Sequence, residues 1–193
     1  SMNGLYAIGN KFSFVIALAT TCFTYAWQDL SFSKANEVGK DGTFYSEGCS
    51  LYAKALTVCT CLALPAIKII FPVLIKGDYV SVDSTIPLFL INAMIAAVST
   101  FVGNVFYAIK DTKTIFISMV ASAALNLCIG YPLIKIWGIN GANISIIISF
   151  VLNIIIRDFV LKKKVGFRFD YKIFPILLWL IVVVFVYIYG NIL

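Results

Sequence analysis

Apolar residues run along this chain in six long stretches separated by short polar segments. A helix needs about 20 apolar residues to cross a hydrocarbon core of about 30 Å, and each stretch is close to that length or longer. The expected fold class is therefore all-α, a polytopic integral membrane protein with one transmembrane domain over residues 1–193. The pattern predicts six spans, at about residues 5–27, 51–75, 86–109, 114–136, 139–161 and 173–191.

Polar and small residues recur at helical spacing inside four of these spans. Such stripes often mark close packing of helices through small side chains. Because polar groups in hydrocarbon must face other helices or a wet cavity, several stripes together also favour a shared polar interior. In chain order the stripes are Asn10, Ser13, Ala17, Thr21, Thr24 and Gln28; Asn92, Ala96, Thr100, Gly103 and Tyr107; Ser118, Ser122, Asn126 and Gly130; and Ser145, Ser149, Asn153 and Arg157.

Basic residues gather in alternate connections between the spans. The segment "RDFVLKKKVGFRFDYK", Arg157–Lys172, holds the strongest cluster, and Lys110 and Lys113 flank the connection before the fourth span. Cationic connections are retained on the cytoplasmic side, so we expect these two and the Gln28–Ser50 connection to be cytoplasmic and both chain ends to face outward. We also expect Gln28–Ser50 to cover the membrane surface as an interfacial helix or short hairpin, with a solvated loop as the alternative.

The composition excludes several classes of protein. With 61% hydrophobic and 12% charged residues, the chain is not a soluble domain. Its net charge of +6 lies mostly in the connections predicted to be cytoplasmic, which favours contact with anionic headgroups over nucleic-acid binding. The chain has no histidine, and its five cysteines have no ligand-like spacing, so we expect no metal site, no cofactor and no enzymatic activity.

Two lysines lie unusually deep in predicted spans. Lys11 and Lys68 are on consecutive antiparallel helices, each about 9–10 Å from the outer end of its helix. The sequence shows no carboxylate at that depth, and a buried unpaired ammonium group is unfavourable. They are therefore expected either to line a water-filled cavity that takes an anionic ligand or to extend their stems toward the headgroups.

Four short segments carry a resemblance to a known family. They are "GLYAIGNKF" (Gly4–Phe12), "YAWQ" (Tyr25–Gln28), "FYS" (Phe44–Ser46) and "WGINGA" (Trp137–Ala142). In this order and spacing they resemble the C-terminal half of the polysaccharide and O-antigen flippases, in the multidrug/oligosaccharidyl-lipid/polysaccharide exporter superfamily. The resemblance runs through at least Gly4–Leu161.

This resemblance implies a two-lobed, MATE-like transporter of the bacterial cytoplasmic membrane. Such a protein moves undecaprenyl-pyrophosphate-linked oligosaccharide to the outer leaflet by alternating access, with that lipid, membrane lipids and an N-terminal lobe as partners. We expect this chain to be the C-terminal lobe of a longer protein. Arg157 then either recruits the pyrophosphate or anchors its helix at the inner interface. The candidate substrate-binding residues are Lys11, Lys68, Arg157, Asn10, Gln28 and Asn153.

Three other functions stay open from the sequence. A multidrug or cation antiporter of the same superfamily needs a membrane carboxylate, and no acidic residue lies deep in a predicted span. An integral membrane polysaccharide polymerase or ligase usually displays a large outer loop, whereas the longest outer connection predicted here, "GDYVSVDST", has nine residues. The third alternative is a membrane assembly subunit without a transport cycle, and only the motif resemblance argues against it.

Overall fold

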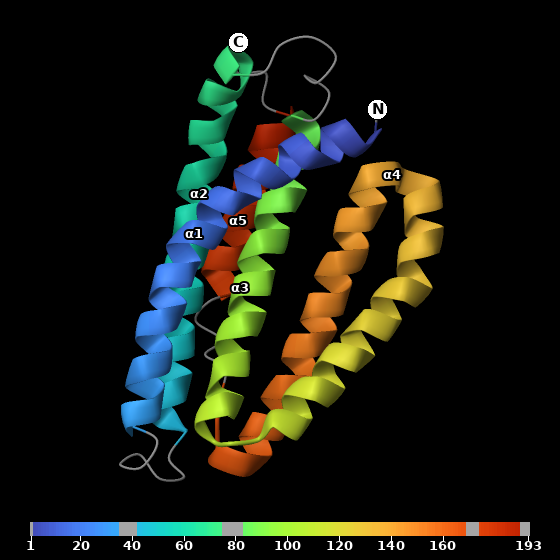
Figure 1. Ribbon diagram of the computed structural model, residues 1–193. Coiled ribbons are helices and arrows are strands. Elements are labelled where there is room, and N and C mark those ends of the chain that lie inside the picture. The colour runs from blue at the N-terminus through green and yellow to red at the C-terminus, as the bar shows by residue number, and fades with distance from the viewer. Residues whose placement is uncertain (1, 35–41, 75–82, 169–173, 190–193) are drawn as a thin grey trace.

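The computed structural model describes residues 2–34, 42–74, 83–168 and 174–189, and these residues form a bundle of helices (Figure 1). No strand occurs in these ranges, so the all-α fold class is confirmed for the part of the chain that the structure describes. The helices are α1 (Met2–Lys34), α2 (Thr43–Leu74), α3 (Ile86–Ala108), α4 (Thr112–Val165) and α5 (Phe174–Tyr189).

The long helix α4 is a hairpin of two arms. Gly138 interrupts it with φ 55° and ψ −128°, a backbone conformation that favours glycine, and Figure 1 shows the chain folding back on itself at this bend. Gly141 lies against the backbone of the first arm, where a Cβ would come within 2.0 Å of the Leu133 carbonyl oxygen. Residues 112–137 (the first arm) and 139–165 (the second arm) thus correspond to the fourth and fifth predicted spans.

Within the described ranges, three helices are long and apolar enough to cross a membrane: Thr43–Phe71, Asp83–Ala108 and Thr112–Val165. Tyr6–Leu18 and Phe23–Ser31, the two sections of α1, meet at a bend of 41° and add a fourth if they count as one span. The apolar helix Pro175–Ile188 within α5 is shorter. The structure therefore supports a membrane protein, and the six-span count stays a prediction.

The connection between α1 and α2 differs from the prediction. Instead of a separate interfacial helix or hairpin over Gln28–Ser50, α1 continues to Lys34 and α2 already begins at Thr43, while residues 35–41 lie outside the described part of the chain. No glycine or proline interrupts residues 28–34, and the rings of Trp27 and Phe44 stack at 5.2 Å between their centroids. Packing between the two helices thus extends both of them beyond their apolar stretches.

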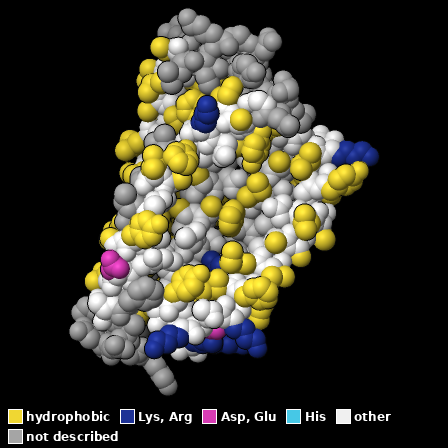
Figure 2. Space-filling view, viewed as in Figure 1, with side chains coloured by type: hydrophobic (Ala, Val, Ile, Leu, Met, Phe, Trp, Pro, Cys, Tyr) yellow, Lys and Arg dark blue, Asp and Glu magenta, His cyan; other side chains and the backbone are white. Residues whose placement is uncertain are grey.

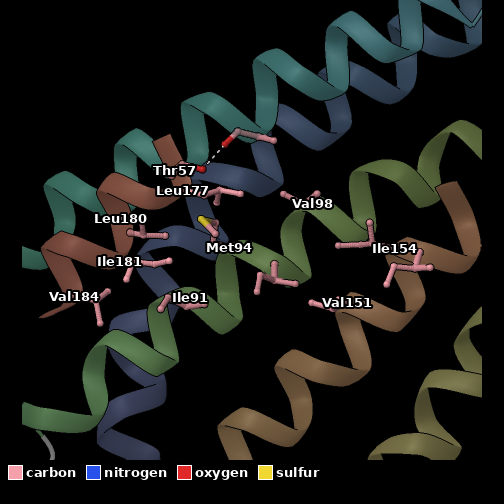
Figure 3. A pocket seen from close by; sticks show the side chains of 13 residues that line it. Thr57, Ile91, Met94, Val98, Val151, Ile154, Leu177, Leu180, Ile181 and Val184 are labelled. Atoms are coloured by element: carbon pink, nitrogen blue, oxygen red, sulfur yellow. Dashed lines mark hydrogen bonds between the residues drawn. The ribbon is translucent and has the colours of Figure 1, made fainter. Parts of the chain in front are cut away.

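The basic connections share one end of the bundle. The end of α1, the start of α2, the turn between α3 and α4 and the end of the second arm all lie at the bottom in Figure 1, opposite the N-terminus and the Gly138 bend. Figure 2 shows Lys and Arg side chains gathered at this same end. The predicted grouping of the three connections is therefore confirmed, and which side of the membrane they face stays a prediction.

Helix α3 lies at the centre of the packing. It contacts α1, α2 and α4, and α5 packs on α2. Two hydrogen bonds join α1 to α3 with the same offset of 76 residues, from Ser13 Oγ to the Phe89 carbonyl (3.2 Å) and from Gln28 Nε2 to Asn104 Oδ1 (2.9 Å), so the two helices run parallel. Phe101 of α3 stacks on Trp27 and on Tyr52, each at 4.6 Å between centroids. These rings join α1, α2 and α3 into one core.

Asp111 fastens the turn between α3 and α4. Its carboxylate accepts hydrogen bonds from the Thr114 backbone N–H (3.3 Å) and hydroxyl (2.5 Å), which caps the first arm, and from Lys164 Nζ (2.7 Å) at the end of the second arm. The hydrogen bond from Lys164 is the main cause that lowers the pKa of the Asp111 carboxyl below its ordinary value of 3.8, and the Thr114 hydroxyl adds to it. Asp111 is therefore more stable as a carboxylate in the folded protein than in the unfolded chain.

We predict that Asp111→Asn lowers the free energy of unfolding at neutral pH. Asparagine keeps the cap on the first arm, so the variant isolates the loss of the charge next to Lys164. Because the folded pKa is lowered, this difference from the wild type is full above the ordinary pKa of 3.8 and disappears as the pH falls through the folded pKa. Detergent-solubilised protein unfolded at a series of pH values checks this, and a difference that persists in strong acid would contradict it.

We predict that Gly141→Ala destabilises the protein by about 1–3 kcal/mol, because the new methyl group meets the rigid backbone of the first arm. Gly130→Ala is the matched control. There the nearest atom to an added Cβ is the Asn126 side-chain oxygen, at 3.2 Å, which is able to move, and alanine favours the helix by up to about 1 kcal/mol. Unfolding with dodecyl sulfate, followed by circular dichroism, compares the two. Equal stability of both variants would contradict the tight contact at the bend.

Candidate functional site

Arg157 lies at the place where α3 meets both arms of α4. Its side chain is only 4% exposed. Nη1 donates to the Ser99 carbonyl (2.5 Å) and hydroxyl (3.3 Å) on α3, and Nε donates to the Ser118 hydroxyl (3.0 Å) on the first arm. Gly103 makes room for the guanidinium, since a Cβ there would lie 2.9 Å from Nη1. The side chain thus turns into the bundle rather than toward the end of its helix.

Among the described residues, the positive charge of Arg157 has only neutral partners. Its hydrogen bonds go to serine hydroxyls and a backbone carbonyl, and no ion pair joins it to an acidic residue in the described ranges. A buried charge without a counter-charge is unfavourable unless polar groups or water surround it. The arrangement therefore leaves an excess of positive charge at the centre of the polar contacts between α3 and α4.

Asn153 continues the polar contacts one turn along the second arm. Its Nδ2 donates to the Ser118 carbonyl at 3.3 Å, while its Oδ1 is buried and has no partner among the described residues. Asn126 and Ser145 join the same two arms through a hydrogen bond of 3.2 Å. A cavity of about 190 Å³ lies between the arms, and its polar lining comprises Ser122, Asn126, Ser149 and Asn153.

A second cavity adjoins the first. It has about 260 Å³, lies between α1, α3 and the second arm, and is lined with the polar residues Asn10, Ser13 and Asn92. Ile146 and Phe150 line both cavities. We call the two together the polar hollow. Figure 2 shows this face of the bundle recessed between α3 and α4.

Both expectations for the polar stripes hold, at different positions. Ser13 and Gln28 make the hydrogen bonds that pack α1 on α3, as expected for stripes of close packing. Asn10, Ser122, Ser149 and other stripe residues line the polar hollow, and Ser13 does both. Gln28 does not line the described cavities, so its amide takes part in helix packing.

Lys68 has an acidic partner, which corrects the prediction. Lys68 Nζ forms an ion pair with Asp83, just before α3, and lies 4.5 Å from the centre of the Tyr187 ring on α5. The Tyr187 hydroxyl donates to the other oxygen of Asp83 at 2.6 Å. The expectation of an uncompensated lysine is therefore wrong for Lys68. Asp83 was assigned to an outer connection, and only the packing of α2 against the start of α3 and α5 brings it to the lysine.

Lys11 lies apart from the other candidate residues. Its side chain is exposed, and no ion pair or hydrogen bond joins it to another described residue. The neighbouring Phe12 ring meets Phe71 of α2 at 5.8 Å between centroids, so the predicted match in depth with Lys68 agrees with the packing. Neither lysine lines the polar hollow.

Of the six candidate residues, the structure thus brings Arg157 and Asn153 together through Ser118 and places Asn10 in the adjoining cavity. The sequence analysis missed Ser99, whose carbonyl accepts the shortest hydrogen bond of Arg157. A signal was present, because Ser99 lies four residues before Gly103 and so on the same helical face. It also missed Asn143, whose Oδ1 accepts from Asn92 Nδ2 at 3.4 Å.

We predict that Ser118→Ala destabilises the protein by about 1.5–3 kcal/mol, because it removes a hydroxyl acceptor from a buried guanidinium. Ser122→Ala is the matched control one turn away, since the Ser122 hydroxyl donates only to the Ser118 carbonyl of its own helix. This variant should change stability by less than about 1 kcal/mol. Unfolding with dodecyl sulfate measures both. An equal effect of the two substitutions would show that the contact between Arg157 and Ser118 contributes nothing particular.

Comparisons of the chain with protein-family models, with curated proteins and with solved structures give no match. The resemblance to the flippases therefore depends on the four sequence segments alone. What the chain does must be inferred from the polar hollow and the buried guanidinium next to it.

Proposed function

We propose that this chain is the C-terminal lobe of a transporter that flips undecaprenyl-pyrophosphate-linked oligosaccharide across the bacterial cytoplasmic membrane for polysaccharide biosynthesis. The observation that carries the proposal is Arg157, a buried guanidinium with only neutral partners among the described residues. It shares Ser118 with Asn153, which belongs to the lining of a hollow where amides and hydroxyls occur among apolar side chains. Such a site attracts an anion, and the resemblance of the four sequence segments narrows that anion to a lipid pyrophosphate.

The lining of the polar hollow favours this function over a cation antiporter. No aspartate or glutamate occurs among the residues that line its two cavities, and cation extruders depend on a carboxylate within the membrane. Amide and hydroxyl groups suit a sugar, because each both donates and accepts hydrogen bonds. Amide and hydroxyl groups carry no net charge, so they hold a ligand loosely enough to allow its release on the other side of the membrane.

In this proposal the chain performs no covalent chemistry. The planar fork of Arg157 matches two phosphate oxygens at once, and Ser99 and Ser118 hold the fork in place until an anion replaces part of their contacts. Asn153 offers its unpartnered carbonyl oxygen to a donor on the ligand. The six spans, the alternating access and the second lobe that completes the pathway are parts of the proposal.

We predict that Arg157→Gln weakens binding of undecaprenyl pyrophosphate to the purified chain at least about tenfold, because a charge-assisted, two-point hydrogen bond to the anion is lost. Arg157→Lys keeps the charge but not the planar fork, so its affinity should lie between those of the wild type and Arg157→Gln. Native mass spectrometry of the chain with undecaprenyl pyrophosphate, undecaprenyl phosphate and undecaprenol measures the affinities, and binding should weaken in that order.

Lys113→Gln is the control, since it removes one exposed positive charge away from the polar hollow. Wild-type affinity in a correctly folded Arg157→Gln variant would overturn the proposed binding site. Transport itself is measured in sealed vesicles with the complete transporter, as the rate at which a labelled lipid pyrophosphate changes leaflets. Binding by the chain without any flipping by the complete transporter would overturn the flippase assignment and favour an assembly subunit.

A further inference from the structure

A third polar cavity lies at the start of α2, at the end of the bundle where the basic connections gather. It has about 310 Å³ and is lined by Ser46, Glu47, Ser50, Leu51, Lys54 and Arg168. None of these residues lines the polar hollow, so the cavity is separate from the site proposed above. It combines two cations, one carboxylate and two hydroxyls.

Two distant parts of the chain build this cavity. Ser46, Ser50 and Lys54 follow one another at steps of four on a single face of α2. Arg168 comes from the segment after α4, and its backbone N–H donates to the Ser46 hydroxyl at 3.0 Å. Arg168 is thereby held close to Lys54, and both line the cavity.

Close backbone packing fixes this junction. A Cβ at Gly42 would lie 2.3 Å from the Val165 carbonyl oxygen and 2.8 Å from the Phe167 nitrogen, so only glycine fits there. The Phe167 side chain is fully buried. The segment that leads to Arg168 is therefore anchored directly before the hydrogen bond to Ser46.

The cavity begins in the first turns of a helix that is long enough to reach the lipid headgroups. The span Thr43–Phe71 has 29 residues, which is about 43 Å at 1.5 Å per residue, close to the thickness of a whole bilayer with its headgroups and longer than the hydrocarbon core of about 30 Å. If the span is centred in the bilayer, Ser46 and Glu47 lie near the headgroups, and Lys54 lies about two turns deeper, from where its stem can extend back toward them. Leu51, also in the lining, is 68% exposed and offers an apolar surface beside the polar groups.

We propose that this cavity binds one phospholipid whose headgroup carries a phosphate and a primary ammonium group, as in phosphatidylethanolamine. Lys54 and Arg168 bind the phosphate, Glu47 accepts from the ammonium group, and Leu51 contacts the start of an acyl chain. The lining charges suit such a headgroup, since two cations meet the phosphate diester and one carboxylate meets the amine. The bound lipid joins the start of α2 to the segment after α4.

The test measures lipid retained by the purified full chain in native mass spectrometry. Phosphatidylethanolamine, phosphatidylcholine and phosphatidylglycerol with the same acyl chains are the probes. The Lys54→Gln, Arg168→Gln double variant should bind phosphatidylethanolamine at least about tenfold more weakly than the wild type. Lys110→Gln, Lys113→Gln is the matched control, because it removes two exposed positive charges from the same end of the bundle and should keep wild-type binding.

Two further results separate the contributions of the groups. Lys54→Arg should retain binding, which distinguishes a lost phosphate contact from a damaged fold. Glu47→Gln should abolish the preference for phosphatidylethanolamine over phosphatidylglycerol while phosphate binding persists. Wild-type lipid affinity in the double variant, an equal loss in the control, or full displacement of the lipid by inorganic phosphate would each overturn the proposal.

Discussion

Arg157 places a full positive charge between α3 and the two arms of α4, and the packing of these three segments depends on how that charge is accommodated. Two serines and one backbone carbonyl supply acceptors from α3 and from the first arm, and Gly103 leaves the space that a larger residue would fill. Hydrogen bonds to charged groups in the interior are both strong and directional. A shift of α3 along α4 by one turn would separate the guanidinium from Ser99 while its bond to Ser118 persists, so this side chain helps to fix the register of α3 on α4.

Arg157 and Lys68 show two different solutions for a cation within the bundle. Lys68 finds a carboxylate and an aromatic ring, and through them it joins α2, the start of α3 and α5. Its charge is neutralised by the protein itself, which marks it as a structural residue. Arg157 has hydrogen bonds but no counter-charge among the described residues, so its electrostatic potential extends toward the adjoining cavities. This difference in counter-charge, rather than the depth of either residue, makes Arg157 the candidate for ligand binding and Lys68 a residue that joins helices.

The sequence predicted those features that follow from local physics. Hydropathy located the apolar helices, the glycines of "WGINGA" fell at the bend of α4, and the distribution of lysines grouped the connections at one end. Helical spacing also placed Asn153 and Arg157 on one face. Contacts between distant residues were out of reach, because no periodicity relates Asp83 to Lys68 or Ser99 to Arg157. The true end of α1 was missed because the helix continues beyond its apolar stretch, through residues 28–34, which hydropathy does not assign to a span.

The α4 hairpin is closed at both of its ends. The Gly138 bend joins the arms at one end, and at the other Asp111 holds the start of the first arm to Lys164 near the end of the second. Asn126, Ser145, Asn153 and Ser118 tie the arms together between these points. The two arms therefore have little freedom to separate. A motion that widens the space beside α3 must move the whole hairpin as one rigid body. Arg157 joins this hairpin to α3 through its hydrogen bonds to Ser99. An anion that competes for the guanidinium would therefore weaken the contact about which the hairpin moves.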